Sequence, residues 1–116
     1  MNFDEALNSH TEWRIMLRNA ATLRKQVDLA AIERDDACVL GRWLGEEAKR
    51  LYGETEAYQD LLAKHLEFHK QAGIVGRAIN GRQYEKVHEM LKLNSPYMRA
   101  ADAVGLAIIR MKYVVK

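Results

Sequence analysis

The chain has 116 residues, of which 48% are hydrophobic and 29% are charged, and its formal net charge is +2 at pH 7. This length fits one domain, residues 1–116, with a real core, and a composition with a single proline excludes a disordered chain. The 18 basic residues are interleaved with 16 acidic ones, so no basic tail or stripe is available for phosphate binding and nucleic acid is not an expected partner.

The amino-terminal sequence MNFDEALNSH carries charge within its first five residues and lacks the apolar segment of a signal peptide. No run of apolar residues approaches the length of about 18 that a transmembrane helix needs. We therefore expect a cytoplasmic protein that is neither exported nor embedded in a membrane.

Apolar residues recur at the helical spacing of three and four along nearly the whole chain. The breaks are few, and they lie at 53–55, at 80–81 and in the sequence LNSPY, where Ser95 can cap a helix that begins with Pro96. No convincing strand alternation occurs. The sequence thus predicts an all-α fold, a four-helix bundle, with helices at 3–26, 38–51, 56–79, 82–93 and 96–114. The last two can also be one helix with a kink at Pro96.

Three of the four histidines lie on the apolar faces of these helices. His10 belongs to the apolar face of 3–26, and both His65 and His69 belong to that of 56–79. Because side chains four residues apart share a helical face at about 5–6 Å, the latter two rings can reach one metal ion. The alternative is that two imidazoles simply fall on one helix flank. His88, beside Val87, has no such partner, and we interpret it as an ordinary, partly exposed histidine.

The only cysteine, Cys38, cannot form an internal disulfide, which leaves a buried apolar residue, a reactive thiol or a metal ligand. Asp35 or Asp36 can act as a helix N-cap, and either would place Cys38 in the first turn of a short additional helix. In that turn, free backbone N–H groups favour a thiolate. Together with three core-facing histidines, this cysteine completes a donor set that zinc uses, and a shared metal would remove the cost of burying three imidazoles.

Enzymatic activity is not expected. A metallopeptidase helix requires a glutamate directly after its first histidine, but Leu66 follows His65, and Glu67 projects about 200° away around the helix. A di-iron bundle requires two Glu-x-x-His motifs, and only Glu85 and His88 have this spacing. Four protein ligands would also leave zinc no position for a catalytic water.

Three short sequences, HTEW, CVLGRWL and HLEFH, occur in this order and resemble the motifs of the chemoreceptor zinc-binding domain family. The later sequence SPYMRAADAVGLAI is similar to the final helix of that family. The resemblance implies a four-helix bundle that binds one Zn²⁺ through three histidines and one cysteine, His10, Cys38, His65 and His69. Trp13 and Trp43 also match the family, and we interpret them as core aromatic residues that flank the site.

Family members are mostly attached to bacterial chemoreceptors or to diguanylate cyclases. In the cyclases, zinc suppresses the output activity. This chain begins with a methionine and ends at Lys116 without a methyl-accepting coiled coil or a nucleotide-cyclising domain. We therefore expect either a free-standing member that acts in trans on such a partner or an excised piece of a longer protein. The family also leads us to expect a homodimer.

Two functions follow from the resemblance. In the first, the domain takes part in chemotaxis or related signal transduction and senses zinc availability or oxidation of Cys38 by an oxidant such as hypochlorous acid. In the second, zinc is a permanent structural staple in an interaction module. Carboxylates or carbonyls are expected to orient the histidine ligands, and the acidic candidates are Asp4, Glu5, Asp28, Asp35 and Asp36.

Overall fold

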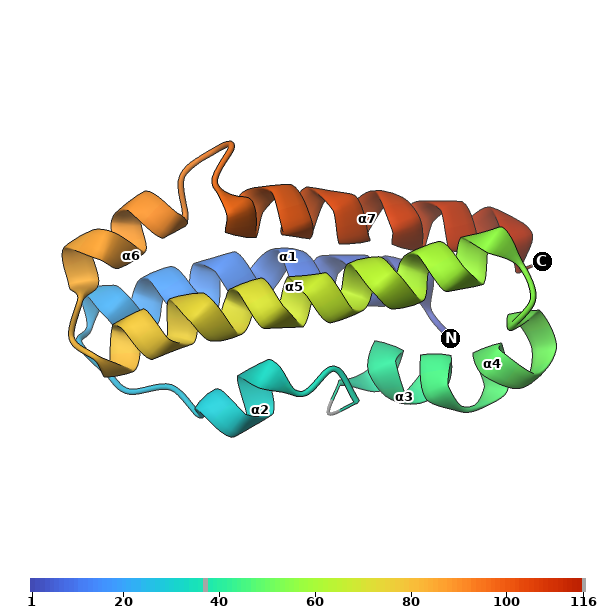
Figure 1. Cartoon of the computed structure of the whole chain (residues 1–116), viewed down its shortest axis with the longest axis horizontal. Coiled ribbons are helices and arrows are strands. Elements are labelled where there is room, and N and C mark those ends of the chain that lie inside the picture. The colour runs from blue at the N-terminus through green and yellow to red at the C-terminus, as the bar shows by residue number, and fades with distance from the viewer. Residues whose placement is uncertain (37, 116) are drawn as a thin grey trace.

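The computed structural model describes residues 1–36 and 38–115, and throughout these ranges it contains helices and connecting segments but no strand (Figure 1). The predicted all-α class is therefore confirmed. The helices are α1 (Phe3–Thr22), α2 (Leu29–Glu33), α3 (Val39–Gly45), α4 (Glu47–Tyr52), α5 (Glu56–Asn80), α6 (Tyr84–Met90) and α7 (Pro96–Val114).

The helices form an up-down-up-down bundle. In Figure 1, α1 and α5 run in the same direction, α7 returns along both of them, and both chain ends lie at one end of the bundle. The fourth position is filled by α2, α3 and α4, which follow one another in a row beneath α5. The predicted four-helix bundle is thus present, with one of its four positions built from short helices.

The longest helices have local signals at their starts. The Thr55 hydroxyl accepts a hydrogen bond from the Tyr58 N–H at 3.2 Å, and the Ser95 hydroxyl accepts one from Met98 at the same distance. Pro96 occupies the first position of α7, where a missing N–H costs nothing. The structure confirms the predicted bounds of α7 and extends the predicted 56–79 helix by a single residue, Asn80.

Two predicted helices were too long. α1 ends at Thr22 because Arg24 adopts a left-handed φ of 55° and its N–H bonds to the Ala21 carbonyl, which closes the helix end. The predicted helix at 82–93 spans only α6. Five residues, 91–95, then separate α6 from α7, with Asn94 at φ 67°, so the alternative of a single kinked helix was wrong.

The predicted helix at 38–51 was also wrong, because α3 ends at Gly45 and α4 begins after Glu46, whose φ of −119° and ψ of −99° are not helical. α2 was not predicted from the sequence. α2 packs tightly on α5, where a Cβ atom added to Gly73 would lie 2.7 Å from the Cγ atom of Glu33. The Asp28 side chain caps α2 by accepting from the Ala31 N–H at 3.2 Å.

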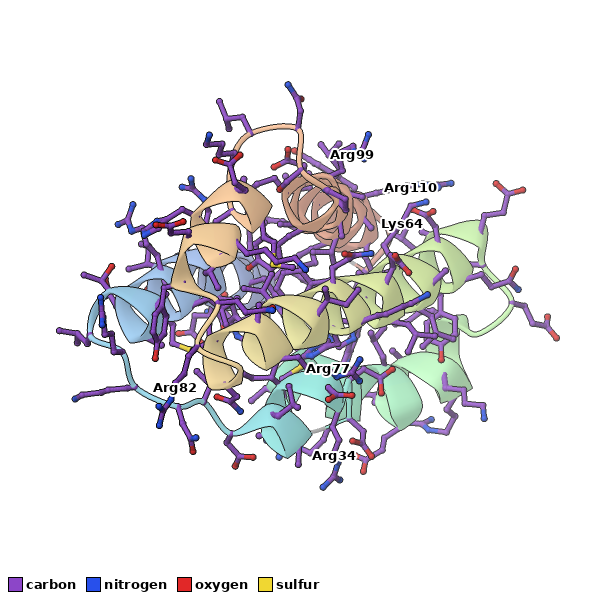
Figure 2. The ribbon with its side chains drawn as sticks, turned by 60° about the vertical axis from the view of Figure 1, so that its left-hand side comes forward. Arg34, Lys64, Arg77, Arg82, Arg99 and Arg110 are labelled. Atoms are coloured by element: carbon purple, nitrogen blue, oxygen red, sulfur yellow. The ribbon has the colours of Figure 1, made fainter. Side chains whose placement is uncertain are left out.

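Charged side chains cover the outside of the bundle. Figure 2 shows Lys64 and Arg77 on α5 and Arg110 on α7 among the exposed basic residues. Arg77 also bonds to the Glu33 carboxylate at 2.9 Å and so ties α5 to α2. Among the described residues, no helix combines the length and the apolar character needed to cross a membrane.

Candidate metal centre

The four residues assigned as metal ligands come together in the middle of the bundle. His10 lies on α1, His65 and His69 lie on α5, and Cys38 lies directly before α3. One ligand atom from each residue falls within 4.8 Å of every other. The fourth histidine, His88, is exposed on α6 and is not part of this cluster.

The α5 pair forms the rigid part of the site. His65 and His69 are each only 1% exposed, and their Nε2 atoms are 3.1 Å apart. Both rings project from one face of a continuous 25-residue helix, so their separation is fixed by the backbone spacing of four residues.

Cys38 joins this pair from the other side. Its Sγ atom is 3.3 Å from Nε2 of His65 and 3.8 Å from Nε2 of His69. The sulfur also accepts a hydrogen bond from the Gly41 N–H at 3.3 Å, so Cys38 is itself the N-cap of α3. The prediction that Asp35 or Asp36 caps this helix was wrong, as was the placement of Cys38 in its first turn.

The two aspartates have other contacts. The Asp36 carboxylate pairs with Arg34 at 3.0 Å. The Asp35 backbone carbonyl lies 3.6 Å from Sγ of Cys38, where it can accept the thiol proton. The turn before α3 therefore presents a backbone oxygen, rather than a carboxylate cap, to the cysteine.

Backbone carbonyls orient two of the imidazoles. Nδ1 of His69 donates to the Ile32 carbonyl at 2.9 Å, and Nδ1 of His10 donates to the Ala6 carbonyl at 2.7 Å. Since a carbonyl oxygen can only accept, these contacts assign the proton to Nδ1 and leave the Nε2 lone pair free. Both lone pairs are thus available for a metal ion.

Of the two kinds of orienting group expected, carbonyls serve His10 and His69. Two of the acidic candidates have structural partners instead, because Asp28 caps α2 and Asp4 pairs with Lys112 at 2.9 Å. The Ile32 carbonyl could not be predicted as the partner of His69, since every residue has a carbonyl and α2 was not predicted.

Burial keeps the three imidazoles neutral. Desolvation lowers the pKa of His10, His65 and His69, and with the neighbouring imidazoles it brings the pKa of His65 to about 3. Desolvation also raises the pKa of the Cys38 thiol, against the opposing effect of the Gly41 N–H. Neutral imidazoles are ready ligands, while the thiol must release its proton when a cation binds.

The ligand separations fit a tetrahedral zinc ion. Zinc bonds of about 2.0–2.1 Å to nitrogen and 2.3 Å to sulfur require N···N edges of about 3.3 Å and N···S edges of about 3.6 Å. The N···N separation of His65 and His69, 3.1 Å, is slightly shorter than the expected N···N edge, and the two N···S separations, 3.3 and 3.8 Å, lie on either side of the expected value. The His10 ligand atom lies within 4.8 Å of the other three. Nε2 of His10 is buried and makes no hydrogen bond, as expected for an atom that binds a metal ion. His10, Cys38, His65 and His69 would together hold the ion.

Aromatic rings enclose the centre. Trp13 packs edge-on against His69 with ring centroids 5.0 Å apart, and Phe68 packs against His10 at 5.2 Å. The flanking position predicted for Trp13 is therefore confirmed. Trp43 packs edge-on against Phe3, at 5.3 Å.

Comparison with known proteins agrees with this geometry. The family model described as the chemoreceptor zinc-binding domain matches residues 10–75, more than half of the chain and a range that contains all four ligands. The match ends before α7, so it does not extend to the resemblance noted for the final helix. No curated protein and no solved structure matched the chain at the significance required. The family is one of zinc-binding domains. The chain belongs to the chemoreceptor zinc-binding domain family.

Proposed function

We propose that this domain is a zinc-dependent regulatory module of bacterial signal transduction, which responds in the cytoplasm to zinc availability or to oxidation of Cys38. The bound zinc ion would supply a Lewis acid that holds the Cys38 sulfur as a thiolate and joins three segments of the chain. The signal of the domain would then depend on whether the Cys38 sulfur is bound to zinc or oxidised.

One observation carries the proposal: the Cys38 sulfur serves two structural purposes. It lies within reach of the metal position, and it caps α3 by accepting from the Gly41 N–H. The histidine ligands lie within the long helices α1 and α5, whereas Cys38 lies between two short ones. Loss of the thiolate would therefore leave the three histidines in place and affect chiefly the start of α3.

Hypochlorous acid can remove the Cys38 thiolate by oxidising its sulfur. The thiolate attacks the chlorine-bearing oxidant to give sulfenic acid and chloride, so sulfur is oxidised and chlorine is reduced. Sulfenic acid is a poorer ligand for the metal than the thiolate, and its sulfur is a poorer hydrogen-bond acceptor for the Gly41 N–H. Its formation would weaken the Cys38 link and allow α3 to move.

The alternative is a permanent zinc staple. It is favoured by the burial of all three histidines, which are at most 5% exposed. In that case zinc would protect the sulfur and Cys38 would react only after unfolding. The module would then act through its surface, with no sensing role.

An oxidant titration distinguishes the two functions. Zinc-loaded protein is treated with increasing hypochlorous acid, while mass spectrometry follows Cys38, a colorimetric chelator follows zinc release, and circular dichroism follows helix content. Sensing predicts that Cys38 is oxidised and zinc affinity falls while most helicity remains. If Cys38 stays reduced until helicity is lost, the staple is the correct function.

The output would pass to a chemoreceptor or a diguanylate cyclase acting in trans, and the module would act as a homodimer. The support for both is the family alone. Sedimentation of the zinc-loaded chain tests the dimer, and a monomer at micromolar concentration would contradict it.

A further inference from the structure

A cavity of about 550 Å³ lies between α1 and α2 and opens beside the metal centre. Its inner wall includes Trp13 and two of the metal ligands, Cys38 and His69. The other lining residues come from the second half of α1, the following segment and α2, and they include Met16, Leu23, Lys25, Asp28 and Ala31.

The cavity exists because α2 is held against α5 rather than against α1. The Asn80 side chain accepts from the Val27 N–H at 2.8 Å and donates to the Val27 carbonyl at 3.0 Å, which fixes the segment before α2 to the end of α5. Gly76 lets α2 approach closely, since a Cβ there would lie 3.1 Å from a methyl group of Leu29. The segment after α1 therefore crosses to α5 before α2 begins. Apolar side chains of α1 and α2 then face one another across the cavity.

The lining has little charge to offer a ligand. Lys25 and Asp28 are its only charged residues, and their formal charges cancel. The Asp28 carboxylate is already engaged by the Ala31 N–H at the start of α2. Apolar and aromatic side chains make up most of the remaining wall, with three amide or imidazole groups among them.

We propose that this cavity binds a small, uncharged, largely apolar molecule, placed directly against the metal ligands Cys38 and His69. The volume falls within the range of about 300–1,000 Å³ typical of small-molecule sites, and the lining has the usual character of such sites, mostly apolar with a few polar groups. The absence of net charge in the lining selects against an anion or a cation. This ligand site adjoins the zinc site, with Cys38 and His69 in the wall between them, and it does not depend on oxidant sensing.

The shape of the cavity suits a small molecule better than a partner helix. Leu23, at the rim, is 62% exposed and Met16 is 41% exposed, but the inner wall at His69 is only 1% exposed. The space therefore deepens from an open apolar rim to a buried end at the metal ligands. A compact molecule can fill such a shape, whereas a helix lying across the rim would leave the buried end empty.

Two fluorescent probes with the same ring system test the proposal on the zinc-loaded chain. N-phenyl-1-naphthylamine is uncharged, and 1-anilinonaphthalene-8-sulfonate carries an added sulfonate. We expect saturable binding of the uncharged probe, with energy transfer from tryptophan that Trp13→Phe reduces more than Trp43→Phe does, while direct excitation shows that the probe remains bound. The sulfonate should bind at least about tenfold more weakly.

Adjacent residues of α2 provide a matched pair of variants. Ala30 and Ala31 are both exposed, but only Ala31 lines the cavity. Ala31→Phe should therefore weaken binding of the uncharged probe by about tenfold or more, whereas Ala30→Phe should leave it unchanged. Circular dichroism and zinc content of both variants establish that the fold is retained.

Several results would overturn the proposal. Absence of saturable binding, equal effects of the two alanine variants, or tighter binding of the sulfonate would each do so. A further outcome is that Ala31→Phe dissociates a dimer in sedimentation without affecting the probe. That result would assign the cavity rim to a second copy of the chain instead.

Discussion

The sulfur of Cys38 lies 3.3 Å from Nε2 of His65, although 27 positions separate the two residues in the sequence. This contact joins the row of short helices to α5, and a bound zinc ion would strengthen it.

Removal of zinc by a chelator should lower the melting temperature, because an ion that binds only the folded chain stabilises it. At a zinc concentration of 1,000 times the dissociation constant, the contribution is about 4 kcal/mol. His65→Ala should lose about one zinc per chain and melt like the chelated protein. His88→Ala alters an exposed histidine outside the cluster and should retain both zinc and melting temperature. Equal melting temperatures with and without zinc would contradict this prediction.

The two purposes of the Cys38 sulfur can be separated by substitution. Cys38→Ser and Cys38→Ala should both weaken zinc retention, since neither supplies a thiolate. A serine hydroxyl can still accept from the Gly41 N–H, whereas alanine cannot, so in zinc-free protein the serine variant should be more stable by about 1 kcal/mol. Urea denaturation of the two chelated variants measures this difference. Identical midpoints would show that the cap contributes nothing.

Gly41 is required where the chain turns into α3. A Cβ at this position would overlap the Asp35 carbonyl oxygen, so Gly41→Ala must displace the turn that carries Cys38. We expect loss of both stability and zinc affinity, although alanine favours a helix by about 1 kcal/mol over glycine. Gly45→Ala is the matched control, since no atom lies within 4 Å of the added Cβ, and it should be neutral or stabilising. Zinc titration and urea denaturation of both variants check this.

Two buried tyrosines should respond in opposite ways to removal of the hydroxyl. The Tyr58 hydroxyl donates to the Leu44 carbonyl at 2.7 Å, whereas the Tyr97 hydroxyl is buried without a partner. At neutral pH, Tyr97→Phe should stabilise and Tyr58→Phe should destabilise the fold, each by about 1 kcal/mol.

The buried Tyr97 hydroxyl also predicts that the free energy of unfolding depends on pH in the alkaline range. Burial raises the pKa of Tyr97 above its ordinary value of 10, so above that pH the unfolded chain ionises first and binds fewer protons than the folded one. The free energy of unfolding should therefore fall as the pH rises above about 10, and this fall should be smaller in Tyr97→Phe. Denaturation curves at neutral and alkaline pH provide the measurement. A fall of equal size in the variant would assign it to other groups.

Arginines with left-handed backbone conformations end two of the long helices. Arg24 follows α1 with φ 55°, and Arg82 follows α5 with φ 60°. Because glycine adopts this conformation without a steric penalty, Arg82→Gly should stabilise the fold by about 0.5–1 kcal/mol. Arg24→Gly should gain less, because the Arg24 guanidinium lies 5.4 Å from the centre of the Tyr84 ring and that contact would be lost. The opposite order of the two melting temperatures would refute this account.

The sequence predicted the elements whose signals are local. α5 and α7 have a regular apolar period, a capping hydroxyl at Thr55 or Ser95, and a proline at the first turn of α7, all of which can be read from neighbouring residues. α2 has only five residues, and its stability comes from the Asp28 cap and from close packing on Gly73 and Gly76, which lie 40 or more positions away. No local period can report such a contact.

The same distinction applies to the metal centre. Its candidate ligands could be selected because imidazole and thiol are distinctive side chains, and the structure brings all four together. The groups that orient His10 and His69 could not be identified, because they are backbone carbonyls of Ala6 and Ile32. The Ala6 carbonyl lies four residues before His10 in the same helix, whereas tertiary packing of α2 on α5 brings the Ile32 carbonyl to His69, and residue type reports neither contact.

The row of short helices also divides the bundle into two parts that differ in their stability against local unfolding. α2, α3 and α4 contain five, seven and six residues, well below the length of about 12–15 at which an isolated helix becomes even marginally stable. This row should detach as one cooperative unit while α1, α5 and α7 remain associated, and its amide protons should exchange with solvent well before those of α5. Cys38 lies within the unit that opens, and the histidines lie within the part that stays closed. Metal binding would then determine how often the domain exposes its interior, without altering the structure that it has when closed.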